Sequence, residues 1–337
     1  MREGSLVSVV APMLDEEGTV AEFYERVCSA LAGEWFELIL VDDGSSDRTP
    51  SIIAELAEAD ERVKLVELSR NFGHQTALTA GLDHASGDAV VMIDGDLQDP
   101  PEVIPDMLAR WRSGADVVYA VRTEREGETR FKLATARLFY RVISKISQVE
   151  LGQDAGDFRL LDRRALDALQ SMRERNRYLR GMTVWVGFTQ AAIPYRRECR
   201  YAGETKYPLR KMVRFALDAI VSFSHTPLQV ATLVGFACAA IAFLGIPAAV
   251  MMRVFGQFVP GVATTVIAVL LLGGIQLMAI GVIGEYVGRI YDEVKARPLY
   301  LVRERRNLDV VPSVAPDAAE PAADRRPAVL PPSGVLR

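Results

Sequence analysis

The sequence Ala-Val-Val-Met-Ile-Asp-Gly-Asp-Leu-Gln-Asp-Pro-Pro-Glu, residues 89–102, decides the fold class and locates the candidate site. Its apolar beginning, 89–93, predicts a buried strand that ends abruptly at Asp94, Asp96 and Asp99. Three crowded carboxylates repel one another unless a cation lies among them, and oxygen ligands favour Mg²⁺ or Mn²⁺. An acidic loop that merely begins a helix is the alternative, so the surrounding sequence has to decide.

Short apolar runs alternate with helical stretches around this segment. We expect strands over 6–10, 37–41, 63–68, 89–93 and 116–121, and helices over 19–32, 49–59, 75–85 and 101–112. This alternation predicts right-handed βαβ units, a mainly parallel sheet and the α/β fold class. Polar residues that follow the strands should therefore lie along one edge of the sheet. Neither the G-x-G-x-x-G nor the P-loop glycine pattern occurs, which argues against those phosphate-binding classes.

Two long uncharged segments predict membrane helices. Of the 337 residues, 50% are hydrophobic and 25% charged, but 219–252 and 254–284 contain no Asp, Glu, Lys or Arg. Each run exceeds the ~20 residues needed to cross a bilayer, although a buried helix pair of a soluble protein is the alternative. Basic residues flank the pair on both outer sides and only Arg253 lies between, which predicts that both flanking parts are cytoplasmic. We expect no signal peptide, because 1–11 has the pattern of a first strand.

Cysteine content and net charge exclude other classes. Cys28, Cys199 and Cys238 form neither a disulfide framework nor a metal-binding pattern. The net charge of −5 combines basic residues clustered near the uncharged runs with acidic residues elsewhere. Nucleic acid is therefore not an expected partner.

Five ordered motifs carry a family resemblance. They are Pro-Met-Leu-Asp-Glu at 12–16, Val-Asp-Asp-Gly-Ser-Ser-Asp at 41–47, Ser-Arg-Asn-Phe-Gly-His-Gln at 69–75, Asp-Gly-Asp-Leu-Gln-Asp-Pro-Pro at 94–101 and Gly-Asp-Phe-Arg-Leu at 156–160. Together they resemble the family-2 glycosyltransferases, and more narrowly their polyisoprenyl-phosphate branch, over roughly 6–303. The branch includes bacterial undecaprenyl-phosphate glucosyltransferases and dolichol-phosphate mannose synthase. The resemblance implies a Rossmann-like GT-A fold, a nucleotide-sugar donor and a lipid-phosphate acceptor.

The chain departs from the family pattern at two positions of its first motif. Asp15 stands where the family usually has Asn, and Leu14 where many members have Tyr, so base or ribose contacts are expected to differ. The Gln-x-x-Arg-Trp motif of processive synthases is replaced by Arg-Tyr-Leu-Arg-Gly at 177–181, which disfavours a polymer synthase.

The resemblance also implies roles for individual residues. A divalent metal, Mg²⁺ or Mn²⁺, is expected on Asp94, Asp96 and Gln98, and the catalytic set is Asp96, Asp157 and Arg122. Asp157 has a turn at a strand start as its alternative, and adjacent acids such as Asp42 and Asp43 commonly hold a turn and cap a helix. The expected nucleotide-sugar contacts are Pro12, Leu14, Glu16, Val41, Asp42, Asp43, Asp94 and Gly95.

The acceptor chemistry calls for cations. A phosphate monoester is already anionic at pH 7, because its second pKa is about 6, so it needs positioning and positive charge more than a base. The alternative for such basic residues is a solvated loop touching anionic lipid headgroups. The residues expected to bind the acceptor phosphate or the diphosphate are Arg122, Arg125, Arg130, Arg137, Arg200 and Lys206.

Several remaining features receive local interpretations. His74 and His84 border one predicted helix, where local structure or ligand contact is expected. Segments 131–147 and 208–222 have amphipathic, basic patterns of interfacial helices, with a core helix as the alternative for the first. Gly284 and Gly288 form G-x-x-x-G, which permits close helix packing in a homo-oligomer, with a tetramer as one candidate.

The resulting hypothesis is a membrane-anchored enzyme. Its expected parts are a GT-A catalytic domain (1–205), a juxtamembrane amphipathic helix (206–225), two transmembrane helices (226–291), a basic cytoplasmic segment (292–308) and a disordered tail (309–337). It would be a multi-pass protein of the plasma (inner) membrane. Its expected reaction transfers a hexose from a nucleotide sugar to undecaprenyl phosphate on the cytoplasmic face, with inversion at the anomeric carbon, and UDP-glucose is the first donor candidate. GDP-mannose, a UDP-aminosugar and a UDP-arabinose derivative are alternative donors. A non-catalytic membrane-anchored nucleotide-sugar sensor is the alternative from another class.

Overall fold

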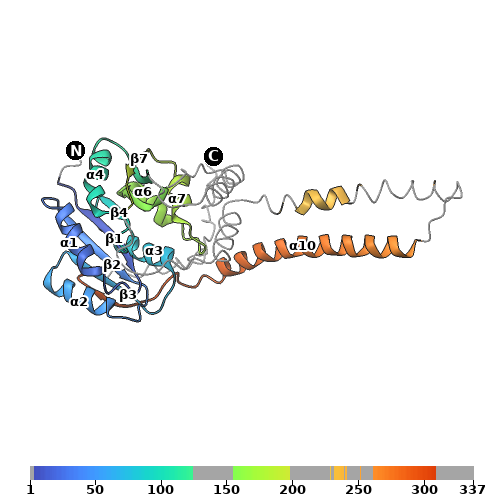
Figure 1. Ribbon diagram of the computed structural model, residues 1–337, viewed down its shortest axis with the longest axis horizontal. Helices are drawn as coiled ribbons and strands as arrows, with labels where there is room; N and C mark the ends of the chain where they lie inside the picture. The colour runs from blue at the N-terminus through green and yellow to red at the C-terminus, as the bar shows by residue number, and fades with distance from the viewer. Residues whose placement is uncertain are drawn as a thin grey trace, which may run out of the picture.

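A computed structural model describes residues 4–123, 155–197 and 261–308, together with 228, 231–238, 240 and 251. Within these residues eight strands form one sheet in the order β7-β5-β6-β4-β1-β2-β3-β8 (Figure 1). The strands are β1 (Val7–Met13), β2 (Phe36–Asp42), β3 (Val63–Leu68), β4 (Ala89–Met92), β5 (Val117–Arg122), β6 (Ala155–Asp162), β7 (Gln190–Tyr195) and β8 (Val302–Arg306).

The sheet is mostly parallel, as the alternating pattern predicts. Strand β1 pairs in parallel with β2 and β4, β2 with β3, and β5 with β7. Strand β6 runs antiparallel between β4 and β5, and β8 runs antiparallel along β3. Because β6 is reversed, its first residues lie at the edge where β4 and β5 end. That reversal brings residue 157 to the acidic loop that follows β4.

Helices cover both faces of the sheet, which explains why every residue of β1 and β2 is buried. Buried side chains of α1 (Val20–Ala30), α2 (Thr49–Ala59) and α4 (Ile104–Arg112) belong to one core cluster, with Trp111 among its largest. Those of α3 (His74–His84), α6 (Arg163–Ser171) and α7 (Leu179–Trp185) belong to the cluster on the other face.

The structure changes the expected helix at 101–112. It begins as a short 3₁₀ turn, η1 (Pro101–Val103), and α4 follows with Pro105 in its first turn. Proline has no N–H to donate back along a helix, so one continuous α-helix through Pro105 would lack a hydrogen bond. The helix expected over 49–59 and the strand over 63–68 have the predicted bounds.

A long helix, α10 (Val262–Val294), extends away from the sheet (Figure 1). Its segment Leu271–Val294 has 24 residues, a mean hydropathy of 1.5 and an apolar stretch with no buried residues. The segment is therefore long and apolar enough to cross a membrane. It is the one such helix among the described residues. Most of the other expected transmembrane segment, both expected interfacial helices and the tail from 309 lie outside the described residues.

The chain returns to the sheet after α10. Strand β8 pairs with β3, and the Ser69 N–H donates to the Leu301 carbonyl at 2.8 Å. The Tyr300 hydroxyl donates to Asp83 at 3.0 Å, and the Asn307 side chain donates to the carbonyls of Ala57 and Val63 at 2.6 and 2.9 Å. Part of the basic segment 292–308 is thus an edge strand of the sheet. Its charged composition suits an edge strand but gives no apolar alternation that would predict one.

The turn after β2 requires glycine at position 44. Gly44 has φ +74°, and a Cβ there would lie 2.5 Å from the Arg70 carbonyl carbon and 2.6 Å from the Asn71 nitrogen.

Gly33 has φ +91°, but a Cβ there would meet nothing within 4 Å, so a substitution at Gly33 measures the cost of backbone strain alone. We expect Gly33→Ala to lower the free energy of unfolding by about 1 kcal/mol and Gly44→Ala by clearly more, about 3 kcal/mol. Urea unfolding followed by tryptophan fluorescence measures both; equal losses would contradict the steric argument.

Candidate active site

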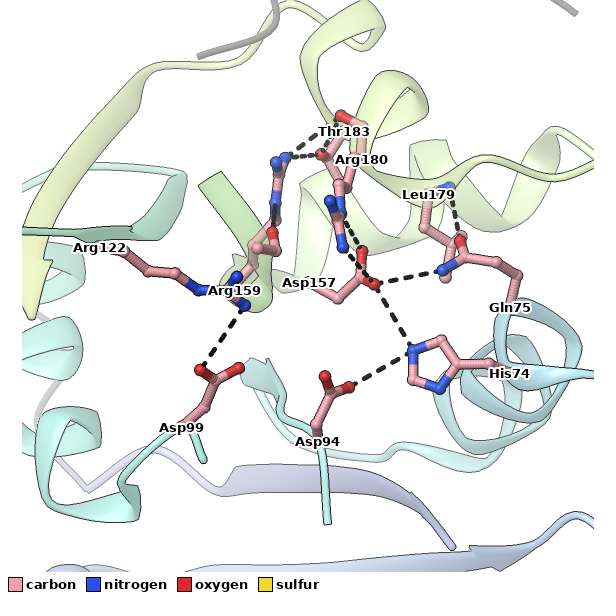
Figure 2. A network of polar contacts seen from close by, with 11 residues as sticks. His74, Gln75, Asp94, Asp99, Arg122, Asp157, Arg159, Leu179, Arg180 and Thr183 are labelled. Carbon is pink, nitrogen blue, oxygen red and sulfur yellow. Dashed lines mark hydrogen bonds and ion pairs between the residues drawn. The ribbon is translucent and has the colours of Figure 1, made fainter. Parts of the chain in front are cut away.

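The candidate site lies where β4, β5 and β7 end and β6 begins. Asp94, Asp96 and Gln98 follow β4, Asp157 comes from the start of β6, and Arg122 ends β5. Figure 2 shows the Asp94 carboxylate pointing toward His74 and Asp157, and the Asp99 carboxylate pointing toward Arg122. The structure therefore brings Asp94, Asp157 and Arg122 of the predicted metal and catalytic residues to one edge, and Asp96 and Gln98 lie on the loop that follows Asp94.

Asp157 is buried and held by several donors. Arg180 from α7 donates to its two oxygens at 2.7 and 3.0 Å, and Gln75 Nε2 donates at 3.4 Å (Figure 2). Burial alone would raise the pKa of this carboxyl, but His74 and Arg180 hold the pKa well below its usual range. Gln75 also accepts from the Leu179 N–H at 3.0 Å, which ties the start of α7 to α3. Asp157 is thus an ionised anchor within the site.

His74 lies between two carboxylates. Its Nε2 is 3.4 Å from Asp94 Oδ1 and 3.5 Å from Asp157 Oδ2 (Figure 2). Burial disfavours the imidazolium, but the hydrogen bond with Asp157 and the negative charge of Asp94 outweigh it, so the pKa of His74 is raised. The raised pKa favours the imidazolium form between the two acids, and His74 is a site residue as well as the first residue of α3.

Asp94 keeps an oxygen without a hydrogen bond in this environment. Burial and the nearby charges of Asp157, Asp99 and Asp96 raise its pKa to about 6, against the opposing charge of His74. Its Oδ1, which His74 approaches at 3.4 Å, is buried and accepts no hydrogen bond from the described residues. A divalent cation would satisfy this oxygen and favour the ionised form, so the donor set fits the metal expected on Asp94, Asp96 and Gln98. The described residues contain no group of three His, Cys, Asp or Glu arranged as ligands, so the third ligand would be the Gln98 amide or a group from outside them.

The acidic loop has a constrained backbone. Leu97, buried between Asp96 and Gln98, has φ +58°, a conformation that costs a non-glycine residue about 1–3 kcal/mol. The Gln98 N–H donates to Asp96 Oδ1 at 3.1 Å and braces the turn. A Cβ at Gly95 would lie 2.3 Å from the Met13 sulfur, so glycine lets the end of β1 pack against this loop.

Asp42 and Asp43 hold loops at the neighbouring strand end. The two oxygens of Asp43 accept from the N–H groups of Phe72 and Gly73 at 2.7 and 2.9 Å. Asp42 accepts from Gly44 and Ser45 at 3.1 and 3.2 Å. Burial raises the pKa of both carboxyls against these donors. Asp42 thus holds the turn after β2, neither residue caps α2, and Asp43 fixes the loop that carries His74.

The remaining predicted nucleotide residues line the same edge. Pro12 and Val41 are buried at the ends of β1 and β2, while Leu14 is 43% exposed just beyond β1. Glu16 accepts from the Thr19 hydroxyl at 2.8 Å, and its N–H donates to the Thr49 hydroxyl at 2.8 Å. These contacts position Glu16 at the start of α1. A nucleotide contact for these residues stays a prediction.

Basic groups occupy the opposite side of the site. Arg122 Nε donates to the Tyr195 hydroxyl at 3.1 Å, and its Nη2 lies 3.9 Å from Asp99 Oδ1. Buried Arg159 donates to the carbonyls of Gly156 and Arg180, both at 3.3 Å, and to the Thr183 hydroxyl, which locks α7 against β6. The other arginines and the lysine predicted to bind phosphate, Arg125, Arg130, Arg137, Arg200 and Lys206, lie outside the described residues.

Comparisons with known proteins identify the class. Residues 8–170 match the family described as Glycosyl transferase family 2. An uncharacterized glycosyltransferase of Bacillus subtilis (strain 168), YkcC, is 46% identical over 90% of this chain and 94% of its own. A bactoprenol glucosyl transferase of Shigella phage SfII is 43% identical over 88% of this chain and 97% of its own. Glucosyl-3-phosphoglycerate synthase from Mycobacterium tuberculosis aligns at 23% identity and a TM-score of 0.47, over 66% of this chain and 81% of that one.

This chain belongs to glycosyl transferase family 2, and it is a glycosyltransferase. The GT-A-like α/β fold expected for the catalytic domain is confirmed. Membership of this family favours the enzyme over the nucleotide-sugar sensor, the alternative from another class.

Sequence reasoning missed the groups that neutralise the acids. Arg180 lies in the segment 177–181, which served only to disfavour a polymer synthase, and Tyr195 had no assigned role. Arg180 is separated from Asp157 by 23 positions along the chain, and Tyr195 from Asp99 by 96. The Arg-x-x-Arg spacing at 177–180, which leads into α7 after the Gly-Asp-Phe-Arg motif, gives the one usable signal for Arg180.

The Asp157–Arg180 pair makes a stability prediction. Removing one partner of a buried ion pair leaves a buried charge uncompensated, so we expect Arg180→Gln to lower the free energy of unfolding by about 3 kcal/mol. Arg164, whose side chain is 67% exposed, pairs with Asp116 and Asp162 at 2.8 and 3.1 Å, and Arg164→Gln should cost less than about 1 kcal/mol. Urea unfolding compares the two variants. A smaller loss in Arg180→Gln than in the control would contradict the anchoring role of Arg180.

Proposed function

We propose that this glycosyltransferase transfers a hexose from a nucleotide sugar to polyprenyl phosphate. The observation that carries the proposal is the division of charge across one site: carboxylates of Asp94 and Asp96 on the loop after β4, and Arg122 at the end of β5. A reaction between a nucleotide diphosphate sugar and a lipid phosphate has to bring two anions together, and this division provides for both. This chain aligns over nearly the whole length of relatives that are named bactoprenol glucosyl transferase, and their name supports the same acceptor class.

The carboxylate side is proposed to take the donor. A divalent metal, Mg²⁺ or Mn²⁺, held by Asp94, Asp96 and Gln98 would supply Lewis-acid stabilisation to the leaving diphosphate. Pro12, Leu14, Glu16, Val41, Asp42, Asp43 and Gly95 would line the nucleoside pocket, with Asp42 and Asp43 acting mainly by fixing its loops. UDP-glucose is the first donor candidate, and GDP-mannose, a UDP-aminosugar and a UDP-arabinose derivative are the alternatives.

The acceptor side needs no strong base. The phosphate of the lipid carries negative charge at pH 7 and can attack the anomeric carbon directly once it is oriented. Asp157 is engaged by Arg180, Gln75 and His74, so it is poorly suited to act as a covalent nucleophile. Direct attack by the acceptor inverts the anomeric configuration. A product lipid with retained configuration would overturn this step.

Helix α10 supports the proposed membrane setting. Its exposed apolar length suits a lipid bilayer, and the basic residues on both outer sides of the uncharged segments favour a cytoplasmic catalytic domain. We propose a multi-pass protein of the plasma membrane that acts on its cytoplasmic face. Gly284 and Gly288 on α10 are suited to close helix packing in a homo-oligomer, with a tetramer as one candidate.

Direct transfer assays test the donor and the metal. Detergent-solubilised protein, undecaprenyl phosphate and labelled UDP- and GDP-sugars are incubated with Mg²⁺ or Mn²⁺, and the lipid is extracted into organic solvent. We expect one sugar to accumulate in the lipid phase and a chelator to abolish its transfer. Transfer that resists chelation would contradict the metal, and failure with every donor by a folded, nucleotide-binding protein would contradict the acceptor.

Asp96→Asn tests the carboxylate side separately. The substitution keeps the shape of the side chain but removes the charge, and we expect transfer to fall by on the order of 100-fold. Asp167→Asn on α6, where the carboxylate is 61% exposed, is the matched control and should transfer at the wild-type rate. Single-turnover rates at saturating donor provide the comparison. An Asp96→Asn protein with wild-type transfer would remove Asp96 from the proposed site.

A further inference from the structure

Three segments converge on Asp99, a residue without a role in the function proposed above. Asp99 follows the acidic loop and is fully buried, Arg122 ends β5, and Tyr195 ends β7, where it pairs with Arg122 in parallel register. Arg197 lies two residues beyond Tyr195. Two arginines and one tyrosine thus surround a single buried carboxylate.

Tyr195 joins the carboxylate to one of the arginines. Its hydroxyl donates to Asp99 Oδ1 at 2.5 Å and accepts from Arg122 Nε at 3.1 Å. Burial and the charge of Asp99 raise the pKa of Tyr195 to about 12, so the phenol stays protonated and keeps donating to Asp99. The ring of Phe158 packs edge-on at 5.9 Å between centroids and fixes the tyrosine ring. A Cβ at Gly156 would lie 3.3 Å from Arg122 Nη2, so the guanidinium packs closely against the backbone of Gly156.

The two guanidinium groups are attracted to the charge of Asp99 but do not donate hydrogen bonds to it. Arg122 Nη2 is 3.9 Å and Arg197 Nε is 3.7 Å from Asp99 Oδ1, within range of charge attraction but beyond a hydrogen bond. Among the described residues, Arg197 Nε is buried and donates no hydrogen bond, and Asp99 Oδ2 accepts none. Two positive charges thus face the single carboxylate of Asp99, and Arg197 Nε remains a donor without an acceptor among the described residues.

We propose that Asp99 is a positioning residue: through Tyr195 and its charge it holds Arg122 and Arg197 together as a paired guanidinium site for the phosphate of the acceptor lipid. This inference rests on the proposed function and names Arg197 and Tyr195 as parts of its acceptor side. Two guanidinium groups without a counter-charge would repel each other, whereas a phosphate accepts hydrogen bonds from both. Asp99 keeps the pair assembled before the lipid arrives.

The position of Asp99 in the chain relates the pair to the donor. Asp99 is adjacent to Gln98 and three residues from Asp96, which the proposed function assigns to the diphosphate side. One loop therefore carries both the residues for one anion and the anchor for the cations of the other. Such a connection fixes the relative position of two reactants that would otherwise repel each other.

The test measures lipid binding without turnover. Binding of undecaprenyl phosphate and of undecaprenol, which lacks the phosphate, to the full-length protein in detergent is followed by microscale thermophoresis. For Asp99→Asn we expect affinity for the phosphate to fall by about tenfold, the size of one lost charge-assisted hydrogen bond, and affinity for the alcohol to stay unchanged. Tyr195→Phe, which removes the bridging hydroxyl and keeps the ring, should weaken phosphate binding in the same direction and covers the case that Asp99→Asn does not fold.

Steady-state transfer gives the second measurement. The KM for the acceptor should rise by about tenfold in both variants while the KM for the donor stays at the wild-type value. Asp106→Asn is the matched control, because Asp106 is an exposed carboxylate on α4, and it should change neither constant.

Two results would overturn the inference alone. Unchanged or tighter phosphate binding in Asp99→Asn would mean that removal of a negative charge simply makes the site more positive, and a rise in donor KM would assign the arginines to the diphosphate. A wild-type protein that binds undecaprenyl phosphate no better than undecaprenol is a different outcome: it would overturn the acceptor of the proposed function and the inference with it.

Discussion

Repulsion among carboxylates at one edge of the sheet is the constraint on which the site depends. Asp94, Asp96, Asp99 and Asp157 meet where β4 ends and β6 begins. Asp157 is offset by Arg180 and His74, and Asp99 by Tyr195 and two arginines. Asp94 and Asp99 each keep a buried oxygen that accepts no hydrogen bond from the described part of the chain. The protein neutralises some of its acids with its own cations, and the proposed metal would neutralise others.

This division also explains how the surrounding helices are held. Arg180 belongs to α7, His74 and Gln75 to α3, and each reaches Asp157 on β6. The packing of these helices therefore depends on polar contacts within the site as well as on the apolar cluster beneath them. A buried charge satisfied in this way contributes little net stability, yet loss of one partner is costly. The arrangement fixes a particular geometry more than it strengthens the fold.

Much of the fold could be predicted because local patterns determine it. The strand 63–68 and the helix 49–59 follow from short apolar runs and turn residues, and the acidic motifs at strand ends indicated the edge on which the site lies. The reversal of β6 and the addition of β8 could not be predicted, because they depend on pairing between distant segments. For the same reason the sequence identified the acids but missed Arg180 and Tyr195. The backbone contacts of Asp42 and Asp43 fit the turn interpretation, whereas their nucleotide contacts stay a prediction.

The return of the chain to the sheet limits the reach of the catalytic domain. Helix α10 ends at Val294 and β8 begins at Val302, and the N–H of Arg175 also donates to Glu293 at 2.7 Å. The connection 295–301 can span at most about 25 Å when fully extended. In the proposed membrane setting, this connection is therefore a short tether between α10 and the sheet that carries the reactive edge. The length of this connection sets an upper limit on the height of that edge above the bilayer, so the proposed site would stay near the depth of a lipid phosphate.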